Sequence, residues 1–177
     1  MESNNLQEYI SATRIRLRKT SPFFAALSLY AEIEFTTKVQ LAATNGKKIF
    51  FNPITYIKLP PLERDGVYLH ELLHMALLHN LRRGIRDHKI FNIAADIVVN
   101  GMIVNEGDCN IPKYGIRDPE LEDLSVEEIY EILIKNKNEY EDYFMDLIND
   151  DMKNEKSEDI DNKDFDGNGI DDNYETG

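Results

Sequence analysis

The stretch that most constrains this chain is Tyr68 to His79, YLHELLHMALLH, an apolar run that contains the pentad HELLH. The run favours a helix, on which His70 and His74 lie about 40° apart on one face. Two imidazoles at this spacing can bind one zinc ion, and the glutamate beside the first histidine can reach a water molecule on the metal. The pentad therefore predicts a zinc-binding helix with Glu71 as general base. The competing interpretation is an ordinary buried helix whose histidines bond to backbone or carboxylates.

A zinc site of this class needs a third protein ligand, and two residues compete for that place. His79 lies five residues after His74, about 140° around the helix from the pair, so it can bind the same ion only if the helix ends first. Asp96 lies on the next predicted helix, Phe91 to about Val104, which is otherwise mostly apolar. A buried carboxylate is costly unless it is paired or binds a metal. We therefore favour Asp96 as the third ligand, with His79 as the alternative.

The helix that carries Asp96 has one polar stripe. Asn92, Asp96 and Asn100 follow one another at intervals of four residues, so they share a face. Asn92 and Asn100 are candidates for groups that orient the metal ligands. They fit equally well as amides that are satisfied within the core.

The predicted chemistry is hydrolysis of a peptide bond. Zinc lowers the pKa of a bound water to about 7 and polarises the scissile carbonyl. Glu71 takes the proton from this zinc-bound water and later passes it to the leaving amine. The oxyanion also needs a hydrogen-bond donor, and the sequence offers three candidates that it does not rank: His88, Arg83 and Tyr68.

The other patterns indicate an α+β chain. Leu6 to Lys19 predicts an amphipathic helix, and Tyr30 to Thr36 alternates with the strand period. Val39 to Phe51 is interrupted by Asn45-Gly46, which favours a tight hairpin, and Ser125 to Glu128 is typical of a capping box. We expect a small antiparallel sheet with a β-hairpin, packed on a mainly helical domain. The hairpin can offer an edge strand to an extended peptide.

The net charge of −13 is concentrated at the C-terminal end. Residues 139–177 contain 15 acidic residues and three lysines, whereas residues 1–138 are near neutral. We expect a domain at 1–138 and a largely disordered acidic tail or linker at 139–177. The charge argues against nucleic-acid or anionic membrane binding, and no stretch is long and apolar enough to span a membrane. The single cysteine, Cys109, fits a reducing compartment, so we expect a cytoplasmic location.

The acidic tail contains one motif of its own. Asp164 to Glu175 resembles a calcium-binding loop, with oxygen ligands at Asp164, Asp166, Asn168 and Glu175 and a glycine at the sixth position. The apolar residue of the loop comes one position early, and no convincing helix flanks it. Calcium binding and a solvated acidic linker are the two interpretations.

Several separate stretches, within about residues 10–135, resemble one known family in that family's order. They are ATRIRL at 12–17, SPFF at 21–24, ATNGKK at 43–48, HELLHMALLH at 70–79, RRG at 82–84, FNIAADIVVN at 91–100 and LSVEEIY at 124–130. The family is the zincin-like metallopeptidase domain of bacterial and archaeal proteins, which usually precedes a von Willebrand factor A-like domain. The resemblance implies a zincin-like fold, bound zinc and peptidase activity on a protein or peptide. It also implies a MoxR-type AAA ATPase as a partner.

The chain departs from this family in two places. Phe91 stands where the family commonly has tryptophan, and the chain stops where a von Willebrand factor A-like domain would follow. We therefore expect either a short family member or an N-terminal fragment. The alternative function is a catalytically inactive, zinc-stabilised scaffold or regulatory module that acts with a partner ATPase.

Overall fold

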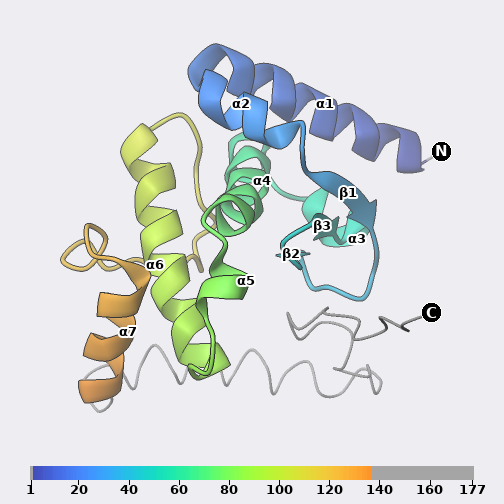
Figure 1. The fold of residues 1–177 in the computed structure, drawn as a ribbon. Helices are drawn as coiled ribbons and strands as arrows, with labels where there is room; N and C mark the ends of the chain where they lie inside the picture. Colours follow the sequence, from blue (N-terminus) through green and yellow to red (C-terminus); the bar gives the residue numbers. More distant parts are fainter. Residues whose placement is uncertain (1, 137–177) are drawn as a thin grey trace, which may run out of the picture.

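The structure is a computed structural model, and it describes residues 2–136. The elements in this part of the chain are α1 (Glu2–Thr20), α2 (Pro22–Ser28), β1 (Glu32–Phe35), β2 (Ala42–Thr44), β3 (Lys48–Phe51), α3 (Pro53–Tyr56), α4 (Pro61–Ala76), α5 (His79–Arg82), α6 (His88–Glu106) and α7 (Val126–Lys135). Helix α4 runs through the middle, with α6 and α7 on one side, the sheet on the other, and α1 and α2 across one end (Figure 1). None of the helices in residues 2–136 combines the length and apolarity that a membrane span requires.

The sheet is mixed, so the expectation of an antiparallel sheet was wrong for one of its two pairings. Its strand order is β1-β3-β2. Strands β2 and β3 form the predicted antiparallel hairpin, and Gly46 in its turn has a φ of +88°. Strand β1 pairs with β3 in parallel, with Ile33 opposite Ile49. After β1 the chain crosses to the far edge before the hairpin begins, so the second hairpin strand returns beside β1 in the same direction. Strands β1 and β2 are therefore the two edges.

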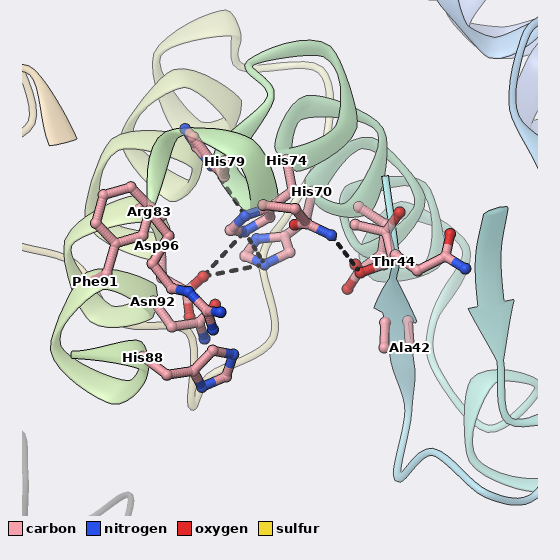
Figure 2. A pocket seen from close by; sticks show the side chains of 15 residues that line it. Ala42, Thr44, His70, His74, His79, Arg83, His88, Phe91, Asn92 and Asp96 are labelled. Atoms are coloured by element: carbon pink, nitrogen blue, oxygen red, sulfur yellow. Dashed lines mark hydrogen bonds and ion pairs between the residues drawn. The ribbon is translucent and has the colours of Figure 1, made fainter. Parts of the chain in front are cut away.

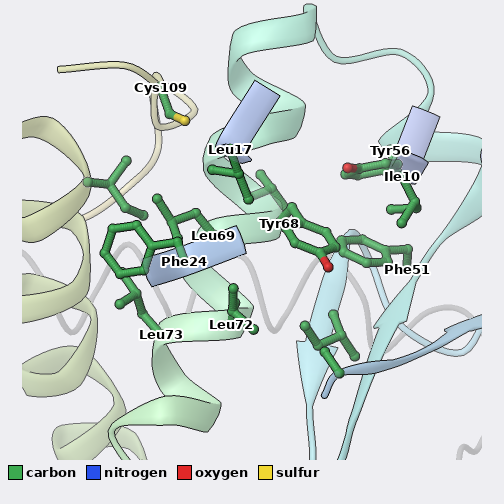
Figure 3. Packing of buried hydrophobic residues seen from close by; sticks show 14 of the residues in the cluster. Ile10, Leu17, Phe24, Phe51, Tyr56, Tyr68, Leu69, Leu72, Leu73 and Cys109 are labelled. Carbon is green, nitrogen blue, oxygen red and sulfur yellow. The ribbon is translucent and has the colours of Figure 1, made fainter. Parts of the chain in front are cut away.

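Helix α4 supplies the centre of the main hydrophobic core (Figure 3). Its buried apolar side chains pack against α1, α2, the sheet and α6, and burial of each leucine contributes about 1.5–3 kcal/mol. The cluster includes Leu69, Leu72 and Leu73 of α4, Leu17 of α1, Phe24 of α2, Phe51 of β3, and Val99 and Ile103 of α6. A second cluster joins α6 to α7 through Phe91, Ile97, Ile129 and Leu133. Because α6 belongs to both clusters, its position against α4 is fixed from two sides.

Two close contacts hold the N-terminal part of α4 in position. Asp65 is 2% exposed and accepts hydrogen bonds from Thr13 and Arg16 of α1. One residue later, the carbonyl oxygen of Asn110 passes so close to Gly66 that a Cβ atom there would lie 2.0 Å from it. Only glycine allows this approach of the backbone.

The helix boundaries follow local capping. Helix α4 begins at Pro61, seven residues before the apolar run at Tyr68, because proline suits the first turn. Helix α6 begins at His88 rather than Phe91, because the Asp87 side chain accepts a hydrogen bond from the backbone of Ile90. The capping box predicted for α7 is confirmed, since Ser125 and Glu128 bond each other's backbone reciprocally.

Candidate metal centre

Three side chains from two helices converge on one point, as Figure 2 shows. His70 and His74 come from successive turns of α4, and Asp96 faces them from α6. The Nε2 atom of His74 lies 3.0 Å from Asp96 Oδ1 and 3.0 Å from Nε2 of His70, and His70 Nε2 lies 3.5 Å from the same carboxylate oxygen. Within residues 2–136, these three form the group whose ligand atoms lie close enough to share one metal ion, all within 4.8 Å of one another.

The hydrogen bonds around His70 determine what it presents to this point. Its Nδ1 atom lies 2.9 Å from Oδ1 of Asn100, and the amide nitrogen of Asn100 donates to the carbonyl of Ile116. The Asn100 oxygen can only accept, so the hydrogen of a neutral His70 sits on Nδ1. Its Nε2 lone pair then faces a carboxylate oxygen and a second imidazole. A shared proton or a divalent metal ion can satisfy such a group of nitrogen and oxygen atoms.

The pKa shifts of His70 and Asp96 also favour positive charge at this site. Burial alone would lower the pKa of His70, but the hydrogen bond and charge of Asp96, with Glu71 and Asn100 adding to them, raise it to about 9. Burial would raise the pKa of Asp96, but its bonds to His70 and His74 hold that pKa well below its usual range. Without a metal, the site therefore holds a proton at neutral pH. A divalent cation would displace that proton on binding.

Glu71 lies in the same pocket and is 8% exposed. Burial raises the pKa of its carboxyl group, against the opposing charges of His70 and His74. A carboxylate whose pKa is raised holds a transferred proton better than an exposed one does. The residue next to the first histidine therefore has the environment of a general base.

His79 contacts the other side of His74. Its Nδ1 atom lies 3.0 Å from Nδ1 of His74, whereas Asp96 and His70 face Nε2 of that ring. Helix α4 ends at Ala76, and Leu78 adopts a left-handed conformation with φ 56° and ψ 36°. This break, which the sequence analysis required for His79 to bind the same ion, occurs without a glycine. The break brings the side chain of His79 into contact with His74, and His79 is 3% exposed there.

The two asparagines of the α6 stripe lie in different environments. Asn100 is 3% exposed and bonds to His70, whereas Asn92 is exposed on the pocket wall. Of the predicted orienting pair, the structure brings Asn100 into contact with a candidate ligand.

The pocket has a volume of about 370 Å³. Strand β2 forms one wall, and the residues of α6 lie across the pocket from it (Figure 2). Asn80, which the sequence analysis missed, lines this pocket and donates a hydrogen bond to the Thr44 carbonyl of β2 at 3.4 Å. No pattern in the sequence distinguishes it, because its role depends on α5 meeting the sheet.

Of the three candidate oxyanion donors, two line the pocket and the third lies in the hydrophobic core. Arg83 and His88 line the pocket. Tyr68 lies on the core side of α4, where it is fully buried, stacks on Phe51 and accepts a hydrogen bond from Arg14. The neighbouring Arg82 forms a double hydrogen bond with Glu127 of α7 and so ties α5 to that helix.

The predicted calcium ligands Asp164, Asp166, Asn168 and Glu175 lie outside the described residues.

Two histidines one turn apart, a facing carboxylate and a buried glutamate in one pocket are the residue set of a metal-dependent hydrolase. Comparison with protein-family models narrows this class. Residues 6–173 match the family described as "Putative metallopeptidase domain", and the chain belongs to this family, as predicted from the sequence. A search of curated proteins and a search of solved structures found no match.

Proposed function

We propose that the chain is a zinc-dependent metallopeptidase of zincin-like fold, in which His70, His74 and Asp96 hold the ion. The convergence of these three acceptors on one point of the pocket carries the proposal. Two imidazole nitrogens and one carboxylate oxygen form a donor set that zinc prefers, and three protein ligands leave a fourth position for chemistry. The side chain of His79 faces the opposite nitrogen of His74, which favours Asp96 over His79 as third ligand.

When bound, a zinc ion acts as a Lewis acid that acidifies water and polarises a carbonyl oxygen. Glu71 accepts one proton from the attacking water as the water oxygen bonds to the peptide carbonyl carbon. When the carbon–nitrogen bond breaks, Glu71 returns that proton to the leaving amine. Its burial and raised pKa support both halves of this role.

The proposed substrate is an extended peptide segment. Strand β2 is an edge of the sheet and also a wall of the pocket, so a peptide that pairs with it passes beside Glu71 and the histidines. Arg83 and His88 are the proposed donors to the oxyanion, since both line the pocket. We propose that the predicted domain at residues 1–138 carries this function, since it contains every residue of the pocket, from Ala42 to Asp96.

The first test compares Glu71→Gln with the wild-type chain and with Glu106→Gln, an exposed glutamate at the end of α6. Elemental analysis should find one zinc per chain in all three proteins. Hydrolysis of an unstructured protein substrate should fall by about 10²–10⁴-fold in Glu71→Gln alone. A wild-type chain that binds zinc and hydrolyses nothing would instead support the scaffold function. A wild-type chain without affinity for zinc would contradict both.

The second test concerns the ligands. Asp96→Asn should lower zinc affinity much more than His79→Asn does, because only Asp96 shares the point at which the two histidines converge. Zinc retained in full by Asp96→Asn and lost by His79→Asn would reverse the assignment. Dialysis against a zinc buffer, followed by elemental analysis, measures both.

A further inference from the structure

His79 holds a buried position behind His74 that the proposed reaction does not use. The two rings meet at 80°, with centroids 4.9 Å apart and Nδ1 atoms 3.0 Å apart. Phe91 closes the other side of His79, with ring centroids 6.4 Å apart. The contact is therefore a directed hydrogen bond within a packed interior.

Only one hydrogen atom can lie between two nitrogen atoms at this distance, so one ring donates and the other accepts. If His79 donates, a neutral His74 carries its own hydrogen on Nε2, the atom that faces Asp96 at 3.0 Å. If His74 donates from Nδ1, its Nε2 keeps a free lone pair, and His79 carries its hydrogen on Nε2. The tautomers of the two rings are thus coupled through one shared bond.

A metal on Nε2 of His74 is compatible with only the second arrangement, because a ligating nitrogen cannot carry a hydrogen. We infer that His79 is a positioning residue whose Nδ1 accepts the hydrogen of His74 and thereby presents Nε2 of His74 to the metal. This inference rests on the proposed function.

The change between the two arrangements conserves protons. The shared hydrogen passes from Nδ1 of His79 to Nδ1 of His74, and the proton on Nε2 of His74 leaves to solvent as the metal binds. His79 takes up one proton at Nε2, an atom that is buried and has no hydrogen-bond partner in the described part of the chain, so this proton must reach it through a local opening of the site. Both rings end neutral.

The backbone at Leu78 supports this role. Leu78 is the one non-glycine residue with positive φ in the described part of the chain, and it lies directly before His79. A left-handed leucine is strained relative to an ordinary helical one, because its Cβ atom approaches the following carbonyl oxygen. The burial of His79 against His74 and Phe91 offsets this strain, so the turn and the imidazole contact hold each other in place.

The direct test is nitrogen NMR of the full chain, labelled with ¹⁵N and loaded with zinc alone. Two-bond correlations between ring nitrogens and ring hydrogens report which nitrogen of each histidine carries a hydrogen. In the loaded chain, His79 should carry its hydrogen on Nε2 and His74 should carry its hydrogen on Nδ1. A hydrogen on Nδ1 of His79 in the loaded chain would overturn the inference.

Three variants separate positioning from packing. His79→Phe keeps a buried ring against Phe91 but removes the acceptor, so its zinc dissociation constant should rise by about 10–100-fold. His79→Asn places an acceptor oxygen where the imidazole has Nδ1, and it should restore most of the affinity. Phe91→Leu disturbs the same packing without changing the acceptor, and its zinc affinity should match that of the wild type.

The outcomes also distinguish this inference from the proposed function. Equal zinc affinity in His79→Phe and the wild type would overturn the positioning role and leave the metal site intact. Equal losses in His79→Phe, His79→Asn and Phe91→Leu would show that only packing matters. A wild-type chain that binds no zinc would overturn the proposed function and this inference together.

Discussion

The side-chain oxygen of Asn100 lies 2.9 Å from Nδ1 of His70, and the amide nitrogen of Asn100 is bonded in turn to the Ile116 carbonyl. The second proposed imidazole ligand, His74, has its own Nδ1 held by a different residue, His79. Each imidazole therefore has its Nδ1 atom held by a hydrogen bond and its Nε2 atom directed at Asp96. Such partners orient a ligand ring and select its tautomer.

Replacement of Asn100 should weaken metal binding although Asn100 is not one of the proposed metal ligands. Asn100→Ala removes the acceptor of the His70 hydrogen, so the zinc dissociation constant should rise by about 10–100-fold. Asn92→Ala is the matched control, because Asn92 comes from the same stripe of α6 but is exposed. Its zinc affinity should remain that of the wild type. Competition with a chromogenic chelator measures both, and equal losses in the two variants would contradict the role assigned to Asn100.

The unfolding stability of the metal-free chain should depend on pH through His79 and His70. Burial, with smaller contributions from the charges of His74 and Arg82, lowers the pKa of His79 from 6.5 to about 3. The unfolded chain therefore binds a proton that the folded chain excludes, and stability is lost as pH falls below 6.5. The pKa of His70 is raised to about 9, so its contribution is complete below pH 6.5 and is lost as pH rises towards 9.

Urea midpoints of the metal-free chain at pH 5, 6.5 and 9 test these two effects. His79→Phe should reduce the loss on the acid side, and Asp96→Asn should reduce the loss on the alkaline side, because it removes the charge that raises the pKa of His70. Glu71 acts in the opposite direction to His79 at acid pH, since its own pKa is raised, so the difference between variant and wild type is the quantity to compare. Stability that still rises between pH 6.5 and 9 would contradict the account of His70.

The residues of the candidate site could be predicted from the sequence because their signals are local. The spacing of His70 and His74 depends only on helix geometry, and Asp96 is conspicuous as a carboxylate in an apolar helix. The structure brings these three together within 4.8 Å. The capping box of α7 was also predictable, because both of its partners lie within four residues.

The features that depend on distant contacts could not be predicted. The parallel pairing of β1 with β3 depends on the path of the chain between β1 and β2, which the local residue pattern does not specify. The helix break at Leu78 has no glycine or proline to announce it, because tertiary contacts of His79 enforce it. Asn92 and Asn100 look alike in the sequence, and only the position of the Ile116 carbonyl separates them.

Gly66→Ala should destabilise the fold strongly, because a Cβ atom at this position would lie 2.0 Å from the carbonyl oxygen of Asn110, a backbone atom. The higher helix propensity of alanine does not offset this clash, and the free energy of unfolding should fall by about 2–3 kcal/mol. Gly115→Ala is the control, because its Cβ would lie 3.0 Å from Cδ1 of Ile111 and 3.1 Å from the Pro112 carbonyl oxygen, contacts that a small shift can relieve. Urea unfolding compares the two variants, and equal losses would contradict the backbone clash at Gly66.

Leu78→Gly should make the turn after α4 less strained. Leucine at φ 56° carries a penalty of about 1–2 kcal/mol, which glycine avoids, while glycine loses about 0.5–1 kcal/mol more backbone entropy on folding than alanine does. The leucine side chain is 54% exposed, so its removal costs little burial. Leu78→Ala is the control, because alanine keeps the strain and loses the same side chain. The glycine variant should therefore unfold with a free energy about 0.5–1 kcal/mol higher than that of the alanine variant, measured by urea denaturation. If the alanine variant were the more stable of the two, the left-handed conformation of Leu78 in the folded protein would be refuted.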